Sequence, residues 1–116
     1  MKGAFEENLA LDFMRAQGLE LIARNVRCRG GELDLVMRDG DTVVVAEVRK
    51  RSREDYGGAE GSIDTRKRRR IVQATRYWLA QTPRYSDWPI RFDVCALNEA
   101  NRVSWLRAAF DAEELT

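Results

Sequence analysis

Residues 31–49, which read GELDLVMRDGDTVVVAEVR, decide the fold that this sequence predicts. Residues 31–38 alternate between two sets of side chains, which is typical of a strand with two different faces. Asp39-Gly40 follows, and this dipeptide between two strand-like runs is a strong signal for a tight hairpin turn. Residues 42–49 are rich in valine and mostly apolar on both faces, which favours a central strand. The stretch therefore predicts a β-hairpin whose second strand lies inside a sheet.

Helical and strand patterns continue on both sides of this hairpin. Before it we expect a helix over residues 4–17 and a strand over residues 19–27. After it we expect, in chain order, a mobile glycine-containing loop over 50–62, a helix over 64–81, strands over 90–97 and 102–107, and a final helix. The predicted order is α-β-β-β-α-β-β-α. It indicates a single domain over residues 1–116 with an α/β fold, in which helices flank a mixed sheet in two or three layers.

Composition excludes several classes of protein. The 116 residues carry a formal net charge of +1 and 44% hydrophobic side chains, which argues against a disordered chain. No apolar run is long enough to span a bilayer, and acidic residues follow the initiating methionine too closely for a signal peptide. Cys28 and Cys95 are too few for a disulfide framework. We therefore expect a cytoplasmic protein with free thiols and no membrane partner.

The chain contains no histidine. This absence excludes Ser-His-Asp and Cys-His catalysis, histidine-ligated metals and phosphohistidine chemistry within the chain. Acid–base or metal chemistry must therefore use carboxylates, Lys, Arg, Tyr or Cys.

Basic side chains are concentrated between residues 49 and 70. Nine bases stand against four acids there, although the whole chain is almost neutral. Such a local field favours contact with a polyanion, and we predict nucleic-acid-binding roles for Arg49, Arg51, Arg53, Arg66, Lys67, Arg69 and Arg70. The competing interpretation is a solvated helix face paired with nearby acids.

Two carboxylates occupy strand positions where an isolated charge would be costly to bury. Asp34 lies between two leucines, on the face opposite to theirs if the strand is regular, and Glu47 lies late in the most apolar strand. The hairpin makes their strands neighbours, so both carboxylates can share one site and hold a divalent cation. Glu7 could supply a third oxygen, and Arg49, two residues after Glu47, could bind the phosphate that the metal polarises. The alternative is a buried ion pair, with Arg49 or Arg91 as the cation, that performs no chemistry.

Arg91 and Asp93 form a further charged pair on the strand predicted over residues 90–97. Their spacing places both on one face of that strand. A structural ion pair explains them more readily than a role as metal ligands.

Several motifs occur together in the order found in one known family. They are Glu7-x-x-Ala10, Gly18, Arg24-Asn25, GELDL at 31–35, Glu47-Val48-Arg49-x-Arg51, Gly57, Lys67, RFDV at 91–94 and Ala109-Phe110. In these motifs the chain resembles the YraN-like uncharacterised proteins. Those proteins in turn look like the PD-(D/E)XK restriction-endonuclease-like superfamily, with a layout close to that of archaeal Holliday-junction resolvases.

The resemblance implies roles for individual residues. Asp34 corresponds to the metal-binding aspartate and Glu47 to the acidic residue of the E-x-K element. Glu7 corresponds to the helix-one glutamate that completes the site, and Lys67 to a basic residue at the start of the second helix. The implied cofactor is Mg²⁺ or Mn²⁺, and resolvase-like relatives suggest a homodimer.

One departure from the pattern affects the expected activity. Arg49 stands where the family usually has lysine, and arginine does not deprotonate in a protein. We expect a nucleic-acid-binding protein that acts as a metal-dependent, structure-selective endonuclease on branched or single-stranded DNA, with an activity weakened by Arg49 in place of the lysine. The sequence does not separate DNA from RNA. The alternative is a catalytically degenerate module that binds nucleic acid or another protein.

Overall fold

Strand β3 (Thr42–Lys50) lies at the centre of the structure, as the valine-rich pattern predicts. The computed structural model describes residues 3–51 and 63–112. Its other elements are α1 (Ala4–Ala16), β1 (Glu20–Cys28), β2 (Gly31–Asp39), α2 (Thr65–Gln81), the short 3₁₀ helix η2 (Pro83–Tyr85), β4 (Ile90–Leu97) and β5 (Val103–Phe110). The predicted loop over residues 50–62 falls almost entirely outside the described residues.

The sheet is mixed, with strand order β1-β2-β3-β4-β5. Strand β2 runs antiparallel to both β1 and β3, and Asp39 pairs with Thr42 across the predicted hairpin turn. Strand β4 runs parallel to β3, and β5 pairs with β4 in the antiparallel direction. Helix α2 lies in the crossover between β3 and β4, which is the usual way to connect two parallel neighbours.

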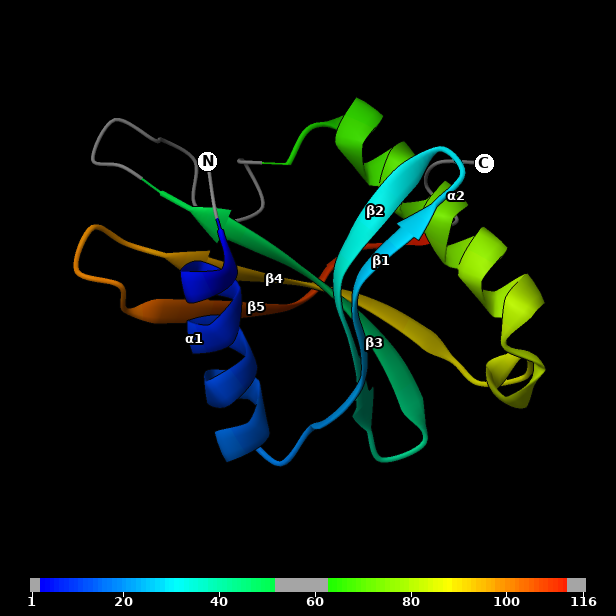
Figure 1. Ribbon diagram of the computed structural model, residues 1–116, viewed down its shortest axis with the longest axis horizontal. Coiled ribbons are helices and arrows are strands. Elements are labelled where there is room, and N and C mark those ends of the chain that lie inside the picture. Colours follow the sequence, from blue (N-terminus) through cyan, green and yellow to red (C-terminus); the bar gives the residue numbers. More distant parts are fainter. Residues whose placement is uncertain (1–2, 52–62, 113–116) are drawn as a thin grey trace.

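The two helices cover opposite faces of the sheet (Figure 1). One apolar cluster joins Ala10, Leu11 and Met14 of α1 to the sheet, and the other joins Ile71, Ala74 and Trp78 of α2 to its opposite face. The structure therefore has three layers, and its α/β layout is compatible with a restriction-endonuclease-like core. None of the helices in the described part of the chain is long and apolar enough to cross a membrane.

The C-terminal region differs from the prediction. Strand β5 continues to Phe110, so residues 108–110 extend the sheet where a final helix was expected to begin. Ala108 has a φ of 51°, and the β4–β5 register shifts close to this residue. Phe110 stacks on Phe92 with ring centroids 4.9 Å apart. Among the described residues, of which only two lie beyond Phe110, no α-helix follows β5.

Candidate functional site

Strand β2 changes the face that it presents at Asp34. Leu33 packs in the cluster beneath α2 and Leu35 in the cluster beneath α1, although alternate residues of a regular strand share a face. The prediction that Leu33 and Leu35 share one face is therefore wrong. On β1, Asn25 lies between the residues paired with Leu33 and Leu35, and its φ of 52° is in the left-handed region. The hairpin bends where these two irregular positions meet, and in Figure 1 its tip curls towards α2.

The Asp34 carboxylate is 4% exposed and closes the end of the β2–β3 pairing. The last backbone pair between these strands joins Leu35 to Ala46. Beyond it, the Val48 N–H donates to Asp34 Oδ2 at 2.9 Å. A side-chain oxygen therefore replaces the next backbone acceptor, and this hydrogen bond helps to hold the carboxylate in place.

Glu47 is 3% exposed on β3 and lies close to a lysine from α2. Lys67 Nζ is 3.4 Å from Glu47 Oε1, and 37% of the lysine side chain is exposed. Asp64, the N-cap of α2, accepts the Lys67 backbone N–H at 2.8 Å. This cap stabilises the first turn of the helix, which carries the lysine. The cation that reaches Glu47 thus comes from a segment well separated in sequence.

Arg49 and Arg51 each carry a buried Nε without a hydrogen-bond partner in the described structure. Leaving a buried donor unsatisfied costs about 1–3 kcal/mol. Arg49 also lines a surface hollow, where its guanidinium could bind an anion.

Glu7 of α1 is 7% exposed and forms an ion pair with Arg24 of β1, with a nitrogen–oxygen distance of 3.6 Å. It lines the same hollow as Asp34. No group of three or more His, Cys, Asp or Glu residues in the described ranges has the geometry to hold a metal ion. The structure therefore brings Glu7 to the site without grouping it with Asp34 and Glu47 as a ready-made set of three ligands.

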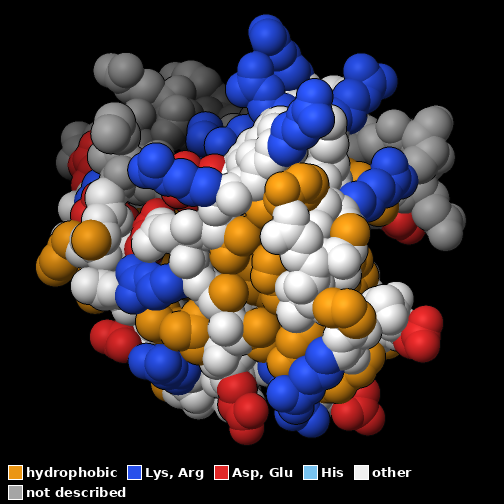
Figure 2. All heavy atoms as spheres, turned by 45° about the vertical axis from the view of Figure 1, so that its right-hand side comes forward, with side chains coloured by type: hydrophobic (Ala, Val, Ile, Leu, Met, Phe, Trp, Pro, Cys, Tyr) orange, Lys and Arg blue, Asp and Glu red, His pale blue; other side chains and the backbone are white. Residues whose placement is uncertain are grey.

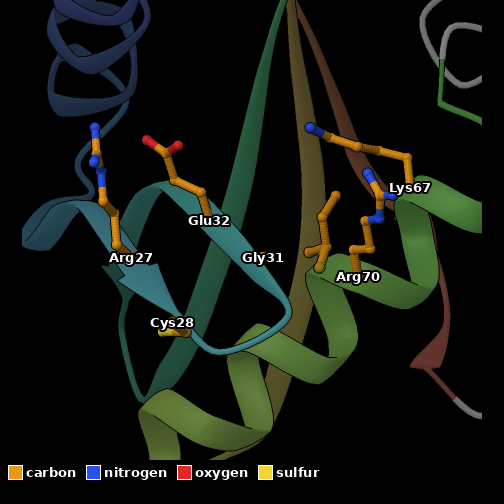
Figure 3. Close-up of a pocket in the computed structure, with 7 residues that line it drawn as sticks. Arg27, Cys28, Gly31, Glu32, Lys67 and Arg70 are labelled. Carbon is orange, nitrogen blue, oxygen red and sulfur yellow. The ribbon is translucent and has the colours of Figure 1, made fainter.

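Three adjoining hollows form one groove between the β1–β2 hairpin, α1 and the start of α2. The first, of about 530 Å³, is lined by Glu7, Arg27, Glu32, Asp34, Val48, Arg49 and Lys50. The second is lined by Arg49, Asp64, Arg66, Lys67 and Arg70. The third, which we call the notch, is lined by Arg27, Cys28, Gly31, Glu32, Lys67, Arg70 and Ile71 (Figure 3). Each hollow shares lining residues with the other two, so the three hollows lie side by side.

The structure separates the basic residues predicted to bind nucleic acid. Arg66, Lys67 and Arg70 line the groove, whereas Arg69 is exposed and is not among its lining residues. Lys and Arg side chains gather at the top of the face in Figure 2, the end where α2 begins in Figure 1. Arg53 lies outside the described residues. The basic run thus contributes to the site mainly through one side of α2.

Arg68, in the basic run over residues 66–70, has a structural role. Its Nε donates to the Ile63 carbonyl at 2.9 Å, and its guanidinium lies 5.3 Å from the centre of the Phe110 ring. Arg68 therefore anchors α2 to β5 rather than facing the groove.

Arg27, Glu32 and Lys50 line the groove, although the sequence interpretation assigned them no role. Arg27 and Glu32 are directly paired across β1 and β2. The positions of Arg27 and Glu32 could have been predicted from the sequence. Antiparallel pairing of the strands predicted over 19–27 and 31–38 places these two residues near the tip of the hairpin.

Asp93 forms a separate buried cluster on β4. It is fully buried and accepts two hydrogen bonds from Arg91, at 2.9 and 3.1 Å, one from Trp105 Nε1 at 2.9 Å and one from the Ala108 N–H at 2.9 Å. Burial opposes the charge of Arg91, but its bonds to Asp93, and then to Asp39, raise the pKa of this guanidinium above its ordinary value. The predicted structural role of this pair is confirmed.

Comparison with known proteins identifies relatives of this chain. Residues 6–97 match the model of a family described as "Uncharacterised protein family UPF0102". A UPF0102 protein of Pseudomonas entomophila is 50% identical over 113 residues, covering 94% of this chain and 92% of the relative. A UPF0102 protein of Cupriavidus taiwanensis is 52% identical, covering 97% and 84%, and one of Legionella pneumophila is 42% identical, covering 96% and 95%.

Proposed function

This chain belongs to the uncharacterised protein family UPF0102, and we propose that it is a nucleic-acid-binding protein that cleaves phosphodiester bonds with a divalent metal ion. One observation carries the proposal. Two nearly buried carboxylates, Asp34 and Glu47, lie on neighbouring strands beside a groove that basic side chains border. A metal and a phosphate would both find compatible charge there.

The residues present fit Mg²⁺ or Mn²⁺. Both ions prefer oxygen ligands, and Mg²⁺ is commonly held by one or two carboxylates, with water and substrate phosphate completing the coordination. Asp34 faces the groove directly. Glu47 lies 3.4 Å from the Lys67 ammonium, and a bound metal ion would take over from this partly exposed lysine as the cation beside Glu47. Two protein carboxylates are therefore enough, and a third ligand from Glu7 is not required.

A bound metal ion would polarise the scissile phosphate and lower the pKa of a water molecule. The chain's own side chains bind and orient the substrate. Arg49 lines the groove and its guanidinium binds a phosphate oxygen, and Lys67 balances the charge of Glu47 when no metal is bound. Arg49 does not act as a general base, because a guanidinium keeps its proton in proteins.

The preferred substrate is branched or single-stranded DNA, with RNA as a second polymer to be tested. The basic part of the groove offers side chains suited to phosphates, and such contacts position a nucleic acid without reading its bases. Binding should weaken as salt concentration rises. A homodimer and a cytoplasmic location belong to the same proposal.

The direct test uses labelled four-way, flap and single-stranded DNA, with Mg²⁺ or Mn²⁺, and a parallel band-shift assay without metal. Asp34→Asn is the informative variant, because the amide oxygen can still accept the Val48 N–H while the negative charge is lost. Asp12→Asn, an exposed substitution on α1, is the matched control. Cleavage that survives in Asp12→Asn and disappears in Asp34→Asn supports the proposal. Equal cleavage by both variants contradicts it.

A second candidate function is nucleic-acid binding without cleavage. Arg49 favours it, because arginine binds phosphate well and cannot orient water as a neutral lysine amine could. Arg49→Lys distinguishes the two functions. Increased Mn²⁺-dependent cleavage would identify a nuclease with a weakened site, whereas a band shift without cleavage in both proteins would identify a binding module.

A further inference from the structure

We propose that the notch between the β1–β2 hairpin and α2 binds the terminal phosphate of a nucleic-acid strand, so that the neighbouring carboxylates act close to a phosphorylated strand end. This inference rests on the proposed function and specifies its substrate. It depends on the notch's charge, its closed base and its connection to Glu47.

The charge of the notch suits a phosphate monoester. Arg27 from the hairpin and Lys67 and Arg70 from α2 line it, with Glu32 as the acidic lining residue. Figure 3 places the hairpin residues on one wall and the helix residues on the other. A terminal phosphate carries about 1.5 to 2 negative charges near neutral pH, against one for an internal diester. Even when Glu47, the partner of Lys67, is counted with Glu32, the three cations exceed the carboxylates by one charge, which favours a terminal phosphate over an internal one.

The base of the notch is closed by backbone packing. A Cβ added to Gly31 would lie 2.9 Å from the Arg70 carbonyl oxygen, and one added to Gly30 would lie 2.9 Å from the Gln73 side chain. The tip of the hairpin thus rests directly on α2. This contact closes the notch on the side of the hairpin tip, so a strand cannot pass between the tip and α2, and a chain end fits this closed side better than a passing chain.

Lys67 connects the notch to the proposed metal site. Its side chain lines the notch, and its Nζ lies 3.4 Å from Glu47. Arg27 and Glu32 likewise line both the notch and the hollow that contains Asp34. A phosphate held in the notch therefore lies next to the carboxylates, and the bond presented to them belongs to a nucleotide near the strand end.

The test measures binding, so it does not depend on cleavage. Three fluorescent single-stranded DNA molecules of one sequence are titrated with the protein in a metal chelator: one with a 5′-phosphate, one with a 3′-phosphate and one with neither, each labelled away from the phosphate. We expect one phosphorylated form to bind about tenfold more tightly than the unphosphorylated strand, since a charge-assisted contact contributes about 1.4 kcal/mol or more.

Two exposed arginines of α2 provide a matched pair of variants. Arg70→Ala should abolish the preference for the phosphorylated strand, and Arg27→Gln should reduce it from the other wall. Arg69→Ala, which removes the same charge outside the groove, should retain it. Thermal melting verifies that each variant is folded.

The outcomes separate the two proposals. Equal binding of all three strands, or equal loss of the preference in Arg69→Ala and Arg70→Ala, overturns the notch assignment, while the cleavage test can still succeed. Failure to bind any strand overturns the proposed function and this inference with it.

Discussion

Asp93 and Asp34 are both almost completely buried aspartates of the same sheet, yet their surroundings differ. The two oxygens of Asp93 accept hydrogen bonds from Arg91, Trp105 and Ala108, and its exposed fraction is 0%. Asp34, at 4%, accepts the Val48 N–H and also lines a hollow open to the surface. The first carboxylate joins β4 to β5, whereas the second lies where the pairing of β2 with β3 ends.

Burial alone therefore does not identify a functional carboxylate. A buried charge surrounded by protein donors has a structural explanation. A buried charge beside a solvent-accessible groove that Lys and Arg side chains line is suited to binding a ligand from solution. Substitutions in one of these two regions, with the other as reference, test this distinction.

The largest effect is expected from Asp93→Ala. It leaves the Arg91 charge and the Trp105 and Ala108 N–H groups without their acceptor, and should lower the free energy of unfolding by about 3–5 kcal/mol. Urea denaturation measures the change, with Asp34→Asn as reference, because that variant keeps an acceptor for Val48. If Asp93→Ala and Asp34→Asn lowered the free energy of unfolding equally, the surroundings of the two carboxylates would not differ in their contribution to stability.

A smaller effect should separate two substitutions of Asp34. Asp34→Ala leaves the buried Val48 N–H without its acceptor and should cost about 1–3 kcal/mol, whereas Asp34→Asn should cost less than about 1 kcal/mol. The same denaturation experiment measures both. A loss of more than about 1 kcal/mol in Asp34→Asn would indicate that the negative charge itself stabilises the fold. Asp34 would then have a structural role like that of Asp93.

Metal binding should stabilise the groove region. Mn²⁺ at about ten times its dissociation constant should raise the free energy of unfolding by about 1.4 kcal/mol, since it binds only the folded chain. Glu47→Gln should remove this gain, and Glu20→Gln, at an exposed position on β1, should keep it. Thermal melting with and without Mn²⁺ provides the measurement, and the same gain in Glu47→Gln would exclude Glu47 as a ligand.

The smallest effect concerns Cys95, which lies near Asp93. Burial, and then the charge of Asp93, raises the pKa of this thiol to about 12. The unfolded thiol loses its proton near pH 9, whereas the folded one retains it, so stability should fall with rising pH between these values. The loss due to Cys95 should be about 1 kcal/mol at pH 10 relative to pH 8. The Cys95→Ala variant should therefore lose less unfolding free energy than the unmodified protein between pH 8 and pH 10. An equal loss in both proteins would contradict a raised pKa for Cys95.

Most of the fold could be predicted from local patterns. The helix predicted over 64–81 is found at Thr65–Gln81, and the strand predicted over 90–97 is found at Ile90–Leu97. Periodicity and turn residues are sufficient for such elements. The end of β5 was missed because two alanines carry no strand signal. The strand continues through the left-handed Ala108 because Asp93 accepts the Ala108 N–H and Phe110 stacks on Phe92.

Part of the candidate site could also be predicted from local patterns in the sequence. Asp34 and Glu47 could be singled out because charges within apolar strands require an explanation. The change of face at Asp34 could not, because it involves the left-handed Asn25 and a side chain that replaces a backbone acceptor. The contact of Lys67 with Glu47 arises from the crossover that lays α2 over the sheet, which no local pattern specifies.

The hydrogen bond from Val48 to Asp34 also makes one backbone amide a spectroscopic probe. Protonation of Asp34, or coordination of a cation by it, would change the electron density at the acceptor and move the ¹H–¹⁵N resonance of Val48. Nuclear magnetic resonance titrations followed at this single cross-peak would therefore report the ionisation and occupancy of the site directly. The probe needs no substrate, no label on the nucleic acid and no turnover.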